Sequence, residues 1–166
     1  MELTFAPRGI VQVDDARIIY RNFSGHAGVY NREGDRSFCL VIDDQETANQ
    51  LIDEGFNVKI KEPREEGGDP FMYLQVKVKY HPKGSEFERL NPVAVLISGR
   101  NRMALDAESI NVLDGIDILR IDMDITGSNY NVNGREGKSA YLKKIYVTQE
   151  EDRFASRYAE EEWPQE

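Results

Sequence analysis

Hydrophobic and polar residues alternate most regularly along Phe71–Tyr80, which reads FMYLQVKVKY. One face of this segment would hold Met72, Leu74, Val76, Val78 and Tyr80, and the other Phe71, Tyr73, Gln75, Lys77 and Lys79. A period of two is typical of a strand with one buried face. The pattern therefore predicts a strand here, with Leu74, Val76 and Val78 in the core.

Shorter segments rich in Val, Ile, Tyr and Phe predict further strands. They are Ile10–Val13, its continuation through Ala16–Phe23, Ser37–Asp43, Phe56–Lys61, Pro92–Ser98, Ile116–Ile125 and Ser139–Thr148. Between the last two, Asn133-Gly134 is a strong signal for a hairpin turn.

Two segments predict short helices among these strands. Asp44–Glu54 begins with a capping aspartate, carries an apolar stripe and is followed by Gly55. Asp106–Asp114 begins and ends in the same way, with Ile110 and Leu113 facing inward.

These elements predict a mainly antiparallel β domain, because strands and helices do not alternate regularly. Closure into a small, OB-like barrel would remove exposed sheet edges, and a sandwich is the alternative. With 166 residues, the chain has the size of one domain, which we assign to residues 1–149, followed by an acidic C-terminal tail at 150–166. That tail is either helical around 153–162 or mobile.

Composition limits the location of the protein. No stretch approaches the roughly 18 apolar residues of a membrane span, and the N-terminal MELTFAPRGI has no pattern of a secretory signal. Cys39 is the only cysteine, so no internal disulfide is possible. We therefore expect a cytoplasmic protein without a membrane partner.

The net charge of −9 argues at first against a nucleic-acid partner. However, residues 150–166 hold seven acidic and two basic residues, a net charge of −5, which leaves −4 for the rest of the chain. A local basic patch on the body of the protein is therefore compatible with the composition.

The sequence offers little for catalysis. His26 and His81 lie in predicted loops, no G-x-S-x-G or P-loop pattern is present, and Cys39 lies among apolar neighbours as a core residue would. Asp117, Asp122 and Asp124 suggest a metal site, but a solvated strand face explains their alternation as well. We expect neither an enzyme nor a cofactor nor a metal.

Binding of a single-stranded nucleic acid is better supported. The polar face of 71–80 carries Tyr73, Lys77 and Lys79, and the segment 56–61 presents Lys59 and Lys61 on one face. If these faces adjoin, rings that stack on bases lie among cations that neutralise phosphates. The alternative is an ordinary solvated face, because Lys also discourages edge pairing of strands.

The segment 21–38, RNFSGHAGVYNREGDRSF, is too long for a plain hairpin connection of two to five residues. It carries Arg21, Phe23, Tyr30, Arg32 and Arg36, with three glycines that permit mobility or close approach. A long loop of this kind contacts nucleic acid in OB barrels. We expect residues 21–36 to be a clamp that is mobile until DNA binds, although Phe23 would equally suit a plug at the end of the barrel.

Other segments add cations to this surface. They are Arg100 and Arg102 in ISGRNRM, and Arg135, Lys138, Tyr141 and Lys143 in GREGKSAYLKK. Each segment alone is also explained as a solvated loop.

Three segments carry a family resemblance that covers most of residues 18–148. RNFSG…YNREGDRSF, LIDEGFNVK and VNGREGKSAYLKKIYVT resemble phage-encoded single-stranded-DNA-binding proteins with an OB-like fold. The resemblance implies non-catalytic coating of single-stranded DNA during replication or recombination. It also implies a tail that competes with DNA for the basic groove and recruits replication proteins, here through Phe154, Tyr158 and Trp163. The rival interpretation is a structural or host-interaction protein that binds a basic partner through its acidic surface.

Overall fold

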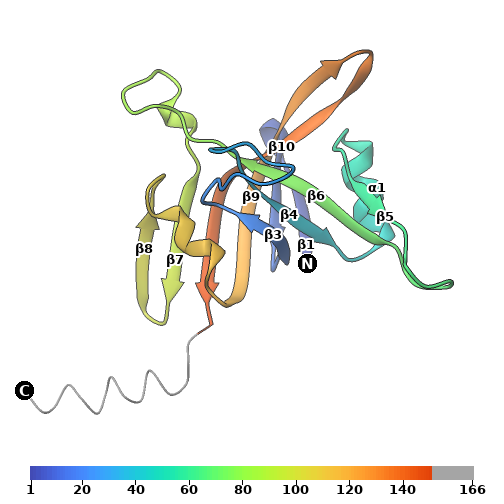
Figure 1. Ribbon diagram of the computed structural model, residues 1–166, viewed down its shortest axis with the longest axis horizontal. Coiled ribbons are helices and arrows are strands. Elements are labelled where there is room, and N and C mark those ends of the chain that lie inside the picture. Colours follow the sequence, from blue (N-terminus) through green and yellow to red (C-terminus); the bar gives the residue numbers. More distant parts are fainter. Residues whose placement is uncertain (151–166) are drawn as a thin grey trace, which may run out of the picture.

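The computed structural model describes residues 1–150, which form one connected sheet of ten strands (Figure 1). The strands are β1 (Glu2–Ala6), β2 (Ile10–Asp14), β3 (Ile18–Asn22), β4 (Arg36–Ile42), β5 (Lys59–Lys61), β6 (Phe71–Val78), β7 (Val93–Ser98), β8 (Asn101–Leu105), β9 (Ile118–Val132) and β10 (Arg135–Gln149). The helices are α1 (Gln45–Asp53) and the short 3-10 helices η1 (Pro7–Gly9), η2 (Glu88–Leu90) and η3 (Ile110–Asp114). No helix within residues 1–150 is long and apolar enough to span a membrane.

The sheet follows the order β1-β2-β9-β10-β6-β4-β3, with β5 beside β6 and the β7–β8 hairpin beside β10. Most pairs are antiparallel, as predicted, but β10 pairs in parallel with both β6 and β7. The sheet is not closed, because within residues 1–150 no ladder joins β3 to β1. The predicted barrel closure is therefore not confirmed. A backbone hydrogen bond of 2.7 Å from the Ala16 N–H to the Ile121 carbonyl holds the residues before β3 against β9.

The core lies under the apolar face of the sheet. Leu74, Val76 and Val78 are at most 4% exposed, which confirms the faces predicted for β6. The neighbouring strand β4 adds Phe38 and Leu40, both fully buried. Burial of these side chains is the main source of the sheet's stability.

Helix α1 confirms the prediction for residues 44–54. The Asp44 carboxylate accepts a hydrogen bond of 2.7 Å from the Thr47 N–H, and this bond lowers the pKa of Asp44. Gly55 follows the helix with a φ of +100°, a conformation that favours glycine. The helix buries Ala48 and Leu51.

The helix predicted at 106–114 is wrong in its length, because only residues 110–114 form a 3-10 helix, η3. The Asp106 carboxylate accepts hydrogen bonds from the Glu108 and Ser109 N–H groups, which closes a local turn instead of starting an α-helix. Ile110 and Leu113 are nevertheless fully buried, as predicted.

Strands β1 and β8 were not predicted, and β9 and β10 extend well beyond the predicted segments. Their added length forms a two-stranded arm around Asn133-Gly134, whose positive φ angles of 52° and 80° confirm the predicted hairpin turn. This arm projects from the sheet on the side away from the β7–β8 hairpin (Figure 1).

Candidate nucleic-acid interface

The polar face of β6 adjoins the lysines of β5, as the sequence suggested. Lys59 lies opposite Tyr73 and Lys61 lies opposite Phe71 in the antiparallel ladder. Directly opposed residues of two strands project from the same face of a sheet. Two aromatic rings and two ammonium groups therefore share one exposed surface.

The N-terminal half of β10 continues this surface on the same edge of β6. Tyr141 is the ladder partner of Lys77, and the Lys77 Nζ lies 5.8 Å from the centroid of the Tyr141 ring. The cation and the ring are thus already close enough to attract one another. Tyr141 stands beside β6, where it can accept a stacked base.

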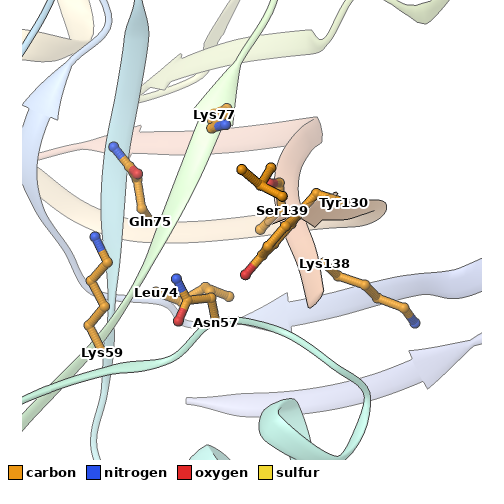
Figure 2. Close-up of a pocket in the computed structure, with 10 residues that line it drawn as sticks. Asn57, Lys59, Leu74, Gln75, Lys77, Tyr130, Lys138 and Ser139 are labelled. Atoms are coloured by element: carbon orange, nitrogen blue, oxygen red, sulfur yellow. The ribbon is translucent and has the colours of Figure 1, made fainter. Parts of the chain in front are cut away.

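A cavity of about 330 Å³ lies between these strands and the arm of β9 and β10 (Figure 2). Lys59, Gln75 and Lys77 line one side of this cavity, and Tyr130 and Ser139 line the other. Figure 2 shows the Lys138 ammonium pointing away from them. Its Nζ lies 5.8 Å from the centroid of the buried Phe56 ring, so the Lys138 side chain covers the core.

Two larger cavities continue from the first one. The second, of about 610 Å³, shares Gln75 and Lys77 with it and is also lined by Tyr30, Arg32 and Arg36. The third, of about 620 Å³, shares Lys79 and Tyr141 with the second and also includes His81, Arg89 and Lys143. Because neighbouring cavities share wall residues, we treat the three together as one feature, which we call the groove.

The lysines of the groove lack carboxylate partners. In residues 1–150, ion pairs form only between Arg32 and Asp35, at 3.5 Å, and between Arg120 and Asp122, at 3.1 Å. Lys59, Lys77, Lys79 and Lys143 therefore carry charge that no neighbouring carboxylate neutralises. Such a surface attracts polyanions despite the negative net charge of the chain.

The loop of residues 23–35 is folded on itself. The Asn31 side-chain amide donates to the carbonyls of His26, Arg32 and Asp35 over 2.7–3.1 Å. Gly25 and Gly34 pack so closely that a Cβ on Gly25 would come within 3.1 Å of the Gly34 backbone. These contacts favour a preformed projection, and the mobile clamp predicted from the glycines stays a prediction. Its tip presents Tyr30, which is fully exposed.

Phe23 was predicted to belong to the DNA interface, and the structure corrects this prediction. Its side chain is fully buried and stacks on Phe38 with ring centroids 5.2 Å apart. The Asp114 carboxylate accepts hydrogen bonds from the N–H groups of Phe23 and Ser24 and fixes this position. Phe23 is therefore a core residue, which agrees with the alternative role of a plug, and it cannot stack on a base.

Arg21 is also engaged within the protein. Its Nη1 donates two hydrogen bonds of 2.8 Å, to the carbonyls of Leu113 and Ile116 beside η3. Arg36 instead lies in the wall of the groove, with its guanidinium carbon 5.1 Å from the centroid of the Tyr80 ring. We keep Arg36 in the candidate interface and leave Arg21 out of it.

The remaining predicted cations lie outside the groove. Lys61 is exposed on β5 beyond the first cavity. Arg100 and Arg102 belong to the β7–β8 hairpin, and Arg135 to the tip of the arm. None of these residues lines the three cavities of the groove. Phe154, Tyr158 and Trp163 lie outside the described residues.

Several wall residues were missed from the sequence. They are Tyr130, His81 and Arg89. His81 and Arg89 lie in the polar connection 79–92, which has no periodicity that could indicate which side chains face β10. His81 and Arg89 are recognised as wall residues only because they line the same cavity as Tyr141 and Lys143.

Of the three aspartates that suggested a metal site, Asp122 has partners within the protein. Asp122 accepts a hydrogen bond from the Asp15 N–H and pairs with Arg120. Its partial burial would raise its pKa, but these bonds lower the pKa overall. No cluster of metal-ligating residues is present within residues 1–150. Cys39 is buried, as predicted, and this burial raises the pKa of its thiol.

Comparison with solved structures shows the same fold in a bacteriophage protein. The single-stranded DNA-binding protein from bacteriophage Enc34 in complex with ssDNA aligns with a TM-score of 0.57 and 12% identity, over 92% of this chain and 93% of the other. A second solved structure of this phage protein, described without ssDNA, aligns with a TM-score of 0.54 and 12% identity, over 93% of each chain. Its C-terminal truncation aligns with a TM-score of 0.52 and 14% identity, over 90% of this chain and 91% of the other.

Comparison with curated proteins gave no significant match. By contrast, a family model described as "Putative phage ssDNA-binding domain" matches residues 4–165, nearly the whole chain. This match confirms the resemblance found in the sequence. The chain therefore belongs to the family of phage ssDNA-binding domains.

Proposed function

We propose that this protein binds single-stranded DNA in the groove, without catalysis and with little sequence preference. The observation that carries the proposal is the row of unpaired lysines beside the half-buried Tyr73 and Tyr141 and the exposed Tyr30, in a member of a phage ssDNA-binding family. The solved relative from bacteriophage Enc34, described in complex with ssDNA, supports the same function.

The rings in and beside the groove would contact the bases, and the cations would contact the phosphates. A base stacked on Tyr73, Tyr141 or Tyr30 contributes roughly 1–3 kcal/mol. Ring faces do not read the edges of bases, so stacking tolerates every sequence. Lys59, Lys77 and Lys79 would contact phosphates, and release of counterions would make the affinity salt-dependent.

In the infected cell, this activity would serve to coat single-stranded DNA during phage replication or recombination in the host cytoplasm.

We also propose that the acidic residues 150–166, with a net charge of −5, compete with DNA for the groove and recruit replication proteins. A tethered segment has an effective concentration in roughly the millimolar range, so weak contacts are sufficient. Deletion of 150–166 should therefore tighten DNA binding, mainly at low salt. Unchanged affinity at low salt would end this proposal for the tail.

The proposed function is tested by fluorescence anisotropy with labelled oligothymidine, oligodeoxyadenosine and a duplex of equal length. We expect similar affinity for both single strands, weaker binding of the duplex, and release as the salt concentration rises. Absence of binding to single strands at low salt would contradict the proposal.

One observation favours the rival function of binding a basic protein partner. Asp14, Asp122 and Asp124 surround a separate cavity of about 250 Å³ beside Lys144. If the anisotropy experiment shows no binding of DNA, this acidic surface is the candidate site for a basic protein partner. Substitution of all three aspartates by asparagine should leave DNA binding intact under our proposal.

A further inference from the structure

Tyr20 has an unusual backbone conformation in the middle of β3. Its φ is +53°, in the left-handed region that bulky residues rarely adopt. The ladder between β3 and β4 is interrupted at this place, between Ile19 and Asn22. A strained residue of this kind persists only where the surrounding structure holds it, and strained positions concentrate at functional sites.

The strained backbone directs the Tyr20 ring onto the polar face of β6. Tyr20 contacts Tyr73 edge to face, with ring centroids 6.3 Å apart and an interplanar angle of 80°. Tyr73 in turn lies against Phe71, with centroids 5.6 Å apart. Tyr20 remains 63% exposed, so core burial does not explain its placement.

Cations flank this aromatic cluster of Tyr20, Tyr73 and Phe71. Lys59 is opposite Tyr73 and Lys61 is opposite Phe71 in the β5–β6 ladder, and both lysines are exposed. Lys59 also lines the first cavity of the groove together with Gln75. The aromatic cluster is therefore continuous with the groove along β6.

We propose that Tyr20 stacks on a base and that the aromatic cluster is a further base-binding subsite of the interface. A nucleobase would lie on the exposed face of the Tyr20 ring, and Lys59 and Lys61 would contact the adjacent phosphates. The bulge of β3 serves to present this ring beside Tyr73. The inference rests on the proposed binding of single-stranded DNA in the groove.

Substitutions at Tyr20 separate the ring from the strain. Tyr20→Phe keeps the ring and should bind oligothymidine within about twofold of the wild type. Tyr20→Ala and Tyr20→Gly remove the ring and should weaken binding by about fivefold to 150-fold. The glycine variant should melt at a higher temperature than the alanine variant, because glycine adopts a positive φ without strain. If the alanine and glycine variants lose affinity equally although their melting temperatures differ, the loss of affinity comes from the missing ring and not from reduced stability.

Tyr146→Ala is the matched control, because Tyr146 lies beside the acidic cavity and should not affect DNA binding. A tryptophan probe gives a direct readout: Tyr20→Trp in a Trp163→Phe background should lose fluorescence when oligothymidine binds. Absence of wild-type binding would refute the proposed function together with this inference. Normal wild-type binding, with unchanged affinity of both the alanine and glycine variants and no quenching, would overturn the inference about Tyr20 alone.

Discussion

At the scale of single residues, Phe23 shows how burial assigns a role. Its ring is enclosed and stacked on Phe38, so Phe23→Ala removes a large core side chain. We expect a loss of about 3–5 kcal/mol in the free energy of unfolding. Thermal or denaturant melting measures this loss, and binding of the remaining folded protein to oligothymidine should be preserved. Lost binding with unchanged melting would instead make Phe23 a DNA contact.

Among the residues of the groove, we expect the charge of Lys77 to act most directly on the affinity for DNA. It lines both of the first two cavities and lies beside Tyr141. Lys77→Ala should reduce the slope of log affinity against log salt by about 0.7, the value for one phosphate contact on a single strand. Arg100→Ala removes the same charge in the β7–β8 hairpin and should leave the slope unchanged. Equal slopes for wild type and the Lys77 variant would remove this residue from the phosphate contacts.

The sequence predicted whether a residue is buried or exposed where hydrophobic and polar residues alternate regularly. Alternation along β6 placed both Val76 in the core and Tyr73 on the outer face. No local period exists around Phe23 or Tyr20. The burial of Phe23 depends on Phe38 and on Asp114, distant in sequence, and the exposure of Tyr20 depends on a bulge. Such non-local contacts were not predictable from the chain alone.

At the scale of elements, strand β6 joins the core to the candidate interface. Val76 is fully buried, and Val76→Asp would place an unpaired charge in the core, so the domain should unfold. Gln75→Asp introduces the same charge on the exposed face of the adjacent position and should leave the melting temperature nearly unchanged. Circular dichroism during heating distinguishes the two variants. A stable Val76→Asp variant would show that the faces of β6 are reversed.

The loop 23–35 tests whether the projection is preformed. Trypsin should cleave slowly after Arg32 in the free wild-type protein, because Asn31 ties its neighbours together through three carbonyls. Asn31→Ala removes these bonds and should accelerate cleavage at this site. Rapid cleavage of the wild type, with protection only when DNA is bound, would restore the mobile clamp.

Some elements could not be predicted because they are not stabilised by burial of an alternating face. The arm of β9 and β10 is polar on both faces around Ser128 and Asn129, and its ladder stabilises it instead. The capping signal at Asp106 is also the signal of a local turn, so it led to a helix that is too long. The helix at Asp44 was predicted correctly because its apolar stripe is also present.

At the scale of the whole molecule, the distribution of charge matters more than its sum. Unpaired lysines gather along the groove, whereas Asp14, Asp122 and Asp124 gather beside Lys144 at a different cavity. The net charge of −9 could not predict this separation, because the parallel pairing of β6 and β10 brings distant lysines together.

The most direct test of the account is photo-crosslinking of the protein to oligothymidine that carries photoreactive bases, followed by mass spectrometry of the peptides. Binding of DNA along β6 and the groove should give crosslinks on the polar face of β6 at Tyr73, on β10 at Tyr141 and at the loop tip around Tyr30. Crosslinks confined to β1, β2 or β8 would contradict binding in the groove, because those strands do not line it.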